Sequence, residues 1–85
     1  MNGGKMKARV YVTLKEGVLD PQGKAVRDAL HALGFGEVAG ARIGKYIELE
    51  LEGSDAKKAG ERVKEMCSRL LANTVIEGFK FEVGK

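Results

Sequence analysis

Residues 42–52 read Arg42-Ile43-Gly44-Lys45-Tyr46-Ile47-Glu48-Leu49-Glu50-Leu51-Glu52. From Ile47 onward, apolar and acidic side chains alternate without a break, which is typical of a strand with one buried and one exposed face. The apolar side holds Ile43, Ile47, Leu49 and Leu51, and the other side holds Gly44, Tyr46, Glu48, Glu50 and Glu52. We expect the rest of the chain to cover the apolar side of this strand.

Residues 8–15 form a second alternating segment, with Val10, Val12 and Leu14 on one side and Arg9, Tyr11, Thr13 and Lys15 on the other. If the two strands are neighbours, Arg9 and Lys15 lie near Glu48 and Glu50, which is a favourable pattern of charges. Nothing else in the chain covers this polar face. We therefore predict an oligomer contact at Tyr11, Thr13, Tyr46 and Glu48.

A helix is predicted between these strands, ending at about Leu33. Asp20 is a suitable N-cap, Pro21 suits the first helical turn, and Gly34 suits the end. Gly23 is a poor helix former, so we expect it to allow close approach of another element. The apolar stripe of the helix consists of Val26, Ala29, Leu30 and Leu33.

Residues 37–41 are expected to form a short strand or an extended arm. The glycines at 40 and 44 leave open whether residues 37–52 make one bent strand or a hairpin. A second helix should begin after Ser54 as N-cap. Its buried face is predicted to hold Ala56, Ala59, Val63, Met66, Cys67, Leu70 and Leu71. Residues 75–83 are the last predicted strand, with Val75, Phe79, Phe81 and Val83 on one face.

This order, β-α-β(β)-α-β, predicts an α+β fold of the ferredoxin-like type. It is a two-layer α/β sandwich, with two helices on one face of a mostly antiparallel sheet. The chain of 85 residues is long enough for one domain, which we place at residues 7–85. Residues 1–6 are expected to be a disordered or extended lead-in.

The composition excludes several classes of function. A single cysteine, Cys67, rules out an internal disulfide and a multi-cysteine metal site, and the N-terminus does not read as a signal peptide. We therefore expect a cytoplasmic protein. The net charge of +3 is spread among interleaved acids and bases, so nucleic-acid binding is not expected. No apolar run approaches the length of a membrane span.

Candidate catalytic groups are few. His31 is the single histidine, and its helix neighbours Arg27 and Gly34 supply no carboxylate or second ligand, so we interpret it as a boundary residue beside the core stripe. Cys67 falls on the apolar stripe of the second helix and is interpreted as a buried structural thiol. We predict no catalytic residue and no metal site.

Two blocks of the sequence, Leu-Asp-Pro-Gln-Gly at 19–23 and Arg-Ile-Gly-Lys-Tyr at 42–46, together with 10–15 and 66–77, resemble the PurS family. PurS is the small subunit of phosphoribosylformylglycinamidine synthase. The resemblance extends from Lys7 to Val83 and implies a PurS-like version of the fold. It departs from the usual PurS start at residues 1–5.

The resemblance also implies a role in purine biosynthesis. The complex is an ATP-dependent glutamine amidotransferase ligase, and this subunit is expected to have no activity of its own. It would bridge a glutaminase subunit (PurQ) and a large synthetase subunit (PurL) and assist ammonia transfer, as a homodimer or a dimer of dimers. ATP, Mg and glutamine would act on the other subunits, so no cofactor is expected here.

Eight exposed residues of the two blocks are hypothesised to contact partner subunits: Asp20, Pro21, Gln22, Gly23, Arg42, Gly44, Lys45 and Tyr46. Helix capping by Asp20 and Pro21 and turn formation at Gly44 explain these residue types equally well. The alternative function is that of an ACT-like regulatory domain that binds a small molecule such as an amino acid.

Overall fold

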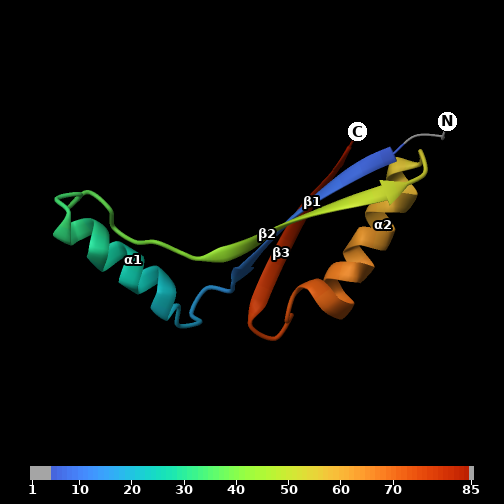
Figure 1. Cartoon of the computed structure of the whole chain (residues 1–85). Helices are drawn as coiled ribbons and strands as arrows, with labels where there is room; N and C mark the ends of the chain where they lie inside the picture. Colours follow the sequence, from blue (N-terminus) through green and yellow to red (C-terminus); the bar gives the residue numbers. More distant parts are fainter. Residues whose placement is uncertain (1–4, 85) are drawn as a thin grey trace.

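A computed structural model describes residues 5–84. Strand β1 (Lys5–Leu14) is followed by helix α1 (Pro21–Ala32) and strand β2 (Gly44–Glu52). Helix α2 (Ala56–Met66), a π-helical turn η1 (Cys67–Leu71) and strand β3 (Glu77–Gly84) complete the chain. The expected α+β class is confirmed (Figure 1).

The sheet has three strands in the order β2-β1-β3, and both pairings are antiparallel. Central strand β1 supplies the core residues Ala8, Val10 and Val12, which pack with Val63 and Cys67 of the α2–η1 segment. These side chains alternate with exposed or half-buried ones along β1, as the sequence predicts. Apolar side chains of β2 and β3 flank this core.

Helix α1 does not take the position expected for it over the sheet. Figure 1 shows α1 beyond the end of the sheet, with α2 alone lying against the sheet. The physical reason is that α1 packs against residues 37–43 of its own chain, through contacts of Asp20 and Gly23 described below. We call residues 19–43 the arm.

The segment at 37–43 is an extended part of the arm and not a strand. β2 begins only at Gly44, so residues 37–52 form neither a hairpin nor one bent strand. At the N-terminal end of the chain, β1 begins at Lys5, and Met6 is buried. Both residues were predicted to belong to the lead-in. Residues 1–4 of that lead-in lie outside the described part of the chain.

Two details of the second helix differ from the sequence-based expectation. Asp55, and not Ser54, is the N-cap, because its carboxylate accepts a hydrogen bond from the N–H of Lys58. Leu70 was expected to face the core but is 83% exposed. The wider π turn, closed by the N–H of Ala72 donating to Cys67, shifts the helical register and turns Leu70 outward.

Two residues at the end of the sheet, Val75 and Lys15, also lie in positions that differ from the sequence-based expectation. Val75 lies in the turn before β3 and is 81% exposed, because the chain bends at Asn73 and the strand begins at Glu77. Lys15 follows the last residue of β1, and its ammonium donates to the carbonyl of Thr74 instead of lying near Glu50. The residue opposite Glu50 is Lys7.

Candidate partner-binding site

The two sequence blocks, residues 19–23 and 42–46, meet where the arm joins the sheet. We call this region the joint. One oxygen of the Asp20 carboxylate accepts a hydrogen bond of 2.8 Å from the N–H of Gly23 and so caps α1. The second oxygen accepts a bond of 2.9 Å from the N–H of Ile43. These bonds, chiefly the one from Ile43, hold the pKa of Asp20 below its ordinary value. A single side chain therefore ties the start of the arm to its end.

Two glycines are required for close backbone contacts at this joint. A Cβ atom on Gly23 would lie 2.3 Å from the carbonyl oxygen of Ala41, so the expected close approach is confirmed. A Cβ atom on Gly44 would lie 2.3 Å from the carbonyl oxygen of Val12 in the neighbouring strand. Gly44 is thus the first residue of β2, where it pairs with Thr13, and is not part of a turn.

A hollow of about 230 Å³ opens at the joint, and its walls include Asp20, Gln22, Gly44, Lys45 and Glu77. Four of the eight predicted contact residues therefore line one concavity. The backbone groups of Ala41 and Ile43 complete the joint. The contributions of these two residues could not be predicted from the sequence, because they act through main-chain atoms that any residue carries.

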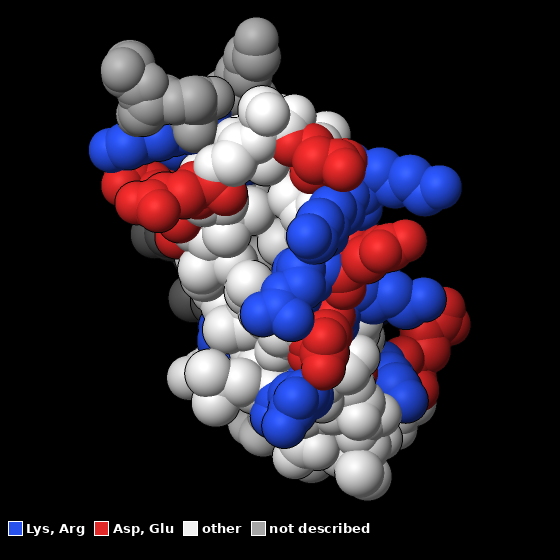
Figure 2. Space-filling view, turned by 90° about the vertical axis from the view of Figure 1, so that its right-hand side faces the viewer, with Lys and Arg blue, Asp and Glu red and all other residues white. Residues whose placement is uncertain are grey.

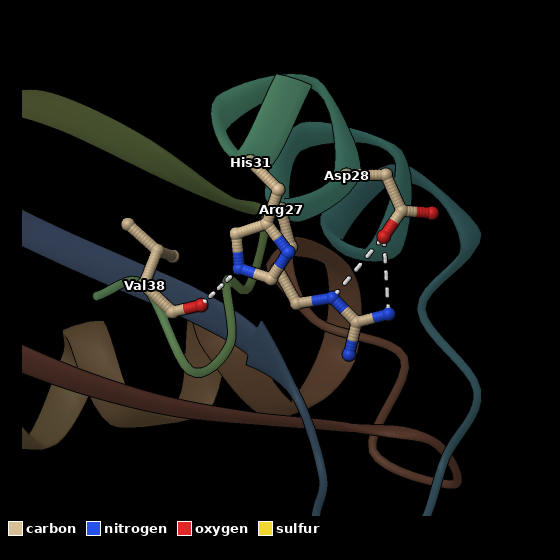
Figure 3. Close-up of polar contacts among 4 residues, drawn as sticks. All are labelled: Arg27, Asp28, His31 and Val38. Carbon is tan, nitrogen blue, oxygen red and sulfur yellow. Dashed lines mark hydrogen bonds and ion pairs between the residues drawn. The ribbon is translucent and has the colours of Figure 1, made fainter. Parts of the chain in front are cut away.

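The far end of the arm is closed by His31. Its Nε2 atom lies 2.6 Å from the carbonyl oxygen of Val38, and this contact holds the returning chain against α1 (Figure 3). On the same helix, the guanidinium of Arg27 contacts the carboxylate of Asp28 at 3.1 Å (Figure 3). His31 therefore has a structural partner, but it is exposed on the arm, whereas the sequence predicts a position at the boundary of the core.

The outer face of the sheet carries the predicted oligomer residues. Tyr11 and Tyr46 are directly paired, with ring centroids 5.2 Å apart, and the ammonium of Lys80 lies 5.3 Å from the Tyr11 ring centroid. Thr13 follows on the same face of β1 and is exposed. Arg9 pairs with Glu48, as predicted. This face is therefore an ordered surface of aromatic and charged side chains.

A hydrogen bond of 2.7 Å from the Tyr46 hydroxyl to the Glu48 carboxylate organises the same surface. This bond raises the pKa of Tyr46 and lowers the pKa of Glu48, because it favours the neutral phenol and the charged carboxylate. Lys7 adds an ion pair with Glu48 at 3.8 Å. Both groups are exposed, so water screens the ion pair.

The exposed side of α2 is a second charged surface. Figure 2, seen from the side on which α2 lies, shows basic and acidic side chains interleaved. Glu65 contacts Arg62 at 4.0 Å and Arg69 at 3.2 Å. A hollow of about 360 Å³ between α2 and the sheet end is lined by residues that include Met6, Leu51, Ala59 and Met66. The sequence pattern did not predict this hollow, because Met6 was assigned to the lead-in.

The chemically reactive groups are placed for structural roles. Cys67 is fully buried in the core, and burial raises the pKa of its thiol, which disfavours the reactive thiolate. Within residues 5–84, no group of three or more histidine, cysteine or acidic side chains is arranged to hold a metal ion. None of the helices within residues 5–84 combines the length and the hydrophobicity that a membrane span needs.

The fold and this joint define a class of protein: a small α+β chain with a projecting helical arm and a surface suited to protein contacts. The chain belongs to the PurS family, described as phosphoribosylformylglycinamidine (FGAM) synthase, whose model matches residues 7–85. The resemblance seen in the sequence is therefore confirmed.

Curated relatives carry the name phosphoribosylformylglycinamidine synthase subunit PurS. The protein from Bacillus subtilis is 58% identical over 77 residues, which cover 91% of this chain and 90% of the relative. The protein from Methanocaldococcus jannaschii is 43% identical over 79 residues, which cover 93% and 95%.

Solved structures share the fold. B. subtilis PurS matches with a TM-score of 0.82 at 56% identity, covering 94% of this chain and 99% of that one. A chain from the structure of PurLQS from Thermotoga maritima matches with a TM-score of 0.86 at 32% identity, covering 94% and 98%.

Proposed function

We propose that this chain is the non-catalytic small subunit of FGAM synthase, which bridges the glutaminase (PurQ) and synthetase (PurL) subunits and assists ammonia transfer. The observation that carries the proposal is the family match across residues 7–85. A similar chain comes from a structure of PurLQS, which favours the same set of partners here. The complex would act in the cytoplasm.

The placement of His31 and Cys67 agrees with a role that is not catalytic. The imidazole of His31 is engaged by the carbonyl of Val38, and the thiol of Cys67 is enclosed by the core. ATP, Mg and glutamine would bind to the other subunits. The contribution of this chain is to hold two active sites in a fixed geometry and to keep water away from the passage between them.

The joint is the proposed contact surface for PurQ and PurL. Asp20, Gln22, Gly44 and Lys45 line its hollow, with Pro21, Arg42 and Tyr46 beside them in the same two segments. Gly23 was expected to be exposed there but is buried against the returning arm, so it supports the surface and does not form part of it. The hydrogen bonds of Asp20 and the close contact at Gly23 fix the backbone of both segments before a partner binds. Preorganisation of this kind lowers the entropic cost of association.

The chain is also proposed to form a homodimer or a dimer of dimers. The outer face of the sheet, with Tyr11, Thr13, Tyr46 and Glu48, is one proposed contact. Paired tyrosines beside fixed charges are typical of an interface that is partly polar.

Assembly tests the proposal directly. PurQ and PurL from the same organism should elute with this chain as one complex in size-exclusion chromatography. Lys45→Ala, which changes the wall of the hollow, should weaken assembly, and Lys64→Ala on the exposed side of α2 is the matched control. Failure of the wild-type chain to enter any complex with either subunit would contradict the proposal.

A further inference from the structure

A groove follows one side of α2. The hollow of about 360 Å³ between α2 and the end of the sheet is joined along the helix by a second hollow of about 220 Å³. Arg62 and Met66 line both hollows, so the two are continuous. We call the two hollows together the α2 groove. An elongated groove beside a helix is suited to a peptide segment of another protein, which lays successive side chains along it.

The floor of the α2 groove is apolar. The larger hollow is lined by residues that include Leu51, Ala59, Met6 and Met66, and Met6 is buried. Methionine is unbranched and polarisable, so these two methionines adapt to the shape of an apolar side chain that enters the hollow. Well-packed pockets of this kind hold the anchor residues that dominate the affinity between proteins. The larger hollow is therefore suited to an apolar anchor.

The rim of the α2 groove carries basic groups that the chain does not neutralise. Lys58 makes no ion pair within residues 5–84, and Arg62 approaches Glu65 at 4.0 Å. Glu65 also contacts Arg69 at 3.2 Å, so one carboxylate serves two guanidinium groups. All of these side chains are exposed. Cationic groups on this rim are therefore available to a ligand.

The two other acidic residues on the rim are engaged within the chain. The carboxylate of Asp55 accepts a hydrogen bond from the N–H of Lys58 and so caps α2. Glu52 lies opposite Lys5 where β2 pairs with β1. Both acids therefore have basic or N–H groups of the chain beside them, and they do not balance the cations of the groove.

The net charge of the chain is concentrated on the same helix. Residues 56–71, which form α2 and η1, include five basic and two acidic residues, and their net charge of +3 equals that of the whole chain. Figure 2 shows basic side chains along α2 with an uncharged area beside them. An excess of one sign of charge beside an apolar pocket favours a ligand that combines the opposite charge with an apolar group.

The α2 groove and the joint lie at opposite ends of the sheet. Met6, near the start of β1, lines the groove, whereas Thr13, near the end of β1, lines the hollow of the joint. Between these two residues the strand rises by about 23 Å. A subunit that bridges two others needs contact surfaces that a single partner does not cover, and this separation provides them.

We propose that the α2 groove binds an acidic segment of one of the two bridged subunits. The segment places an apolar side chain in the larger hollow and carboxylates beside Lys58 and Arg62. This inference rests on the proposed function, because PurQ or PurL supplies the segment, but it uses a different surface from the joint. Nucleic acid fits the groove less well, since its described lining contains no aromatic residue on which a base could stack.

Charge reversal tests the rim of the groove. Lys58→Glu and Arg62→Glu should each weaken the binding of one subunit, PurQ or PurL, by about tenfold at low salt, because each variant brings like charges together. Biolayer interferometry with this chain immobilised measures the Kd of each subunit separately. Lys64→Glu is the matched control, since it changes the charge of α2 by the same amount and Lys64 does not line the groove.

Obstruction of the larger hollow tests the apolar anchor independently of charge. Ser54→Trp places a large ring at the wall of this hollow and should weaken the binding of the same subunit by tenfold or more. Ser68→Trp is the matched control, because Ser68 is an exposed serine of η1 outside the groove lining. All the substituted residues are exposed, so the variants should keep the wild-type fold, which circular dichroism and Tm check.

The outcomes separate this inference from the proposed function. Weaker binding of one subunit by the three groove variants, with wild-type affinity in Lys64→Glu and Ser68→Trp, is the expected result. Wild-type affinity of the groove variants for both subunits, or an equal loss in Lys64→Glu, would overturn the groove contact and leave the bridging function in place. A wild-type chain that binds neither PurQ nor PurL would overturn both proposals.

Discussion

The carboxylate of Asp20 accepts a hydrogen bond of 2.9 Å from the N–H of Ile43, a residue 23 positions further along the chain. The same carboxylate caps α1 through Gly23. The arm is therefore closed at its root by one side chain, and at its tip by the contact between His31 and Val38. This closure holds the two segments that connect the arm to the sheet next to each other, and the proposed partner contacts lie on these segments.

Asp20→Asn should separate the two functions of this carboxylate. The asparagine side chain has one carbonyl oxygen and can still cap α1, but it cannot accept from Gly23 and Ile43 through two oxygens. We expect faster amide hydrogen exchange at Ile43 and little change at Gly23. Asp20→Ala should accelerate exchange at both positions and lower Tm by a few degrees. Unchanged exchange at Ile43 in Asp20→Asn would show that the second bond does not hold the arm.

The stability of the wild type should depend on pH through the same group. The pKa of Asp20 is lower in the folded chain than its ordinary value, so the carboxylate favours the fold. This contribution is fully present above the pKa of the unfolded chain and is lost as pH falls through the folded pKa. The Tm difference between wild type and Asp20→Asn should therefore be constant above about pH 5 and shrink below about pH 4. A difference that grows on acidification would contradict the assignment.

Gly23→Ala should destabilise the chain even though alanine is the better helix former. The added Cβ would lie 2.3 Å from the carbonyl oxygen of Ala41 and 2.7 Å from Oδ2 of Asp20. We expect a loss of about 1–3 kcal/mol in the free energy of unfolding, measured by urea titration. Gly36→Ala is the matched control, because nothing lies within 4 Å of its Cβ position. Equal stability of the two variants would refute the close contact.

Tyr46→Phe should raise the pKa of Glu48, because the hydroxyl that stabilises the Glu48 carboxylate is removed. Carbon-13 NMR of the side-chain carboxyl measures this shift. In the reciprocal variant Glu48→Gln, the pKa of Tyr46 should fall toward the ordinary value of tyrosine. A spectrophotometric titration in a Tyr11→Phe background isolates Tyr46, since these are the two tyrosines of the chain. Unmoved pKa values in both variants would mean that the hydrogen bond does not persist in solution.

Free amino acids should not stabilise the isolated chain. An ACT-like regulatory domain would show a rise in Tm that grows with ligand concentration, because a ligand that binds the folded state shifts the folding equilibrium. Differential scanning fluorimetry against the common amino acids measures this directly. A saturable rise in Tm with one of them would favour the regulatory alternative.

Much of the fold follows from local patterns. The alternation in β1 and β2 predicts both strands. If the strands are neighbours, it also places Arg9 near the acidic residues of β2, where it is paired with Glu48. Asp20 caps the helix that Pro21 begins, as expected. These features depend on residues close in sequence, or on a strict period of two. The π turn at η1 was not predictable in this way, because Leu70 has the same spacing from Val63 and Met66 that a buried residue in a regular helix would have.

The position of α1 shows where pattern analysis fails. The stripe formed by Val26, Leu30 and Leu33 predicts a buried helical face, but it does not identify what buries it. The sequence favoured the chain's own sheet, whereas the structure directs α1 away from the sheet. The decisive contacts, from Gly23 to Ala41 and from Asp20 to Ile43, involve backbone atoms far along the chain. The sequence-based hypothesis nevertheless groups the two blocks at 19–23 and 42–46 as partner contacts, and the structure brings them together at the joint.

The central claim is that this chain couples the two active sites of FGAM synthase. The most direct test measures the synthase rate of PurQ and PurL with glutamine and, separately, with ammonium chloride, in the presence and absence of this chain. We predict that the chain restores the glutamine-driven rate and leaves the ammonia-driven rate almost unchanged. Indifference of both rates to the chain would contradict the bridging function.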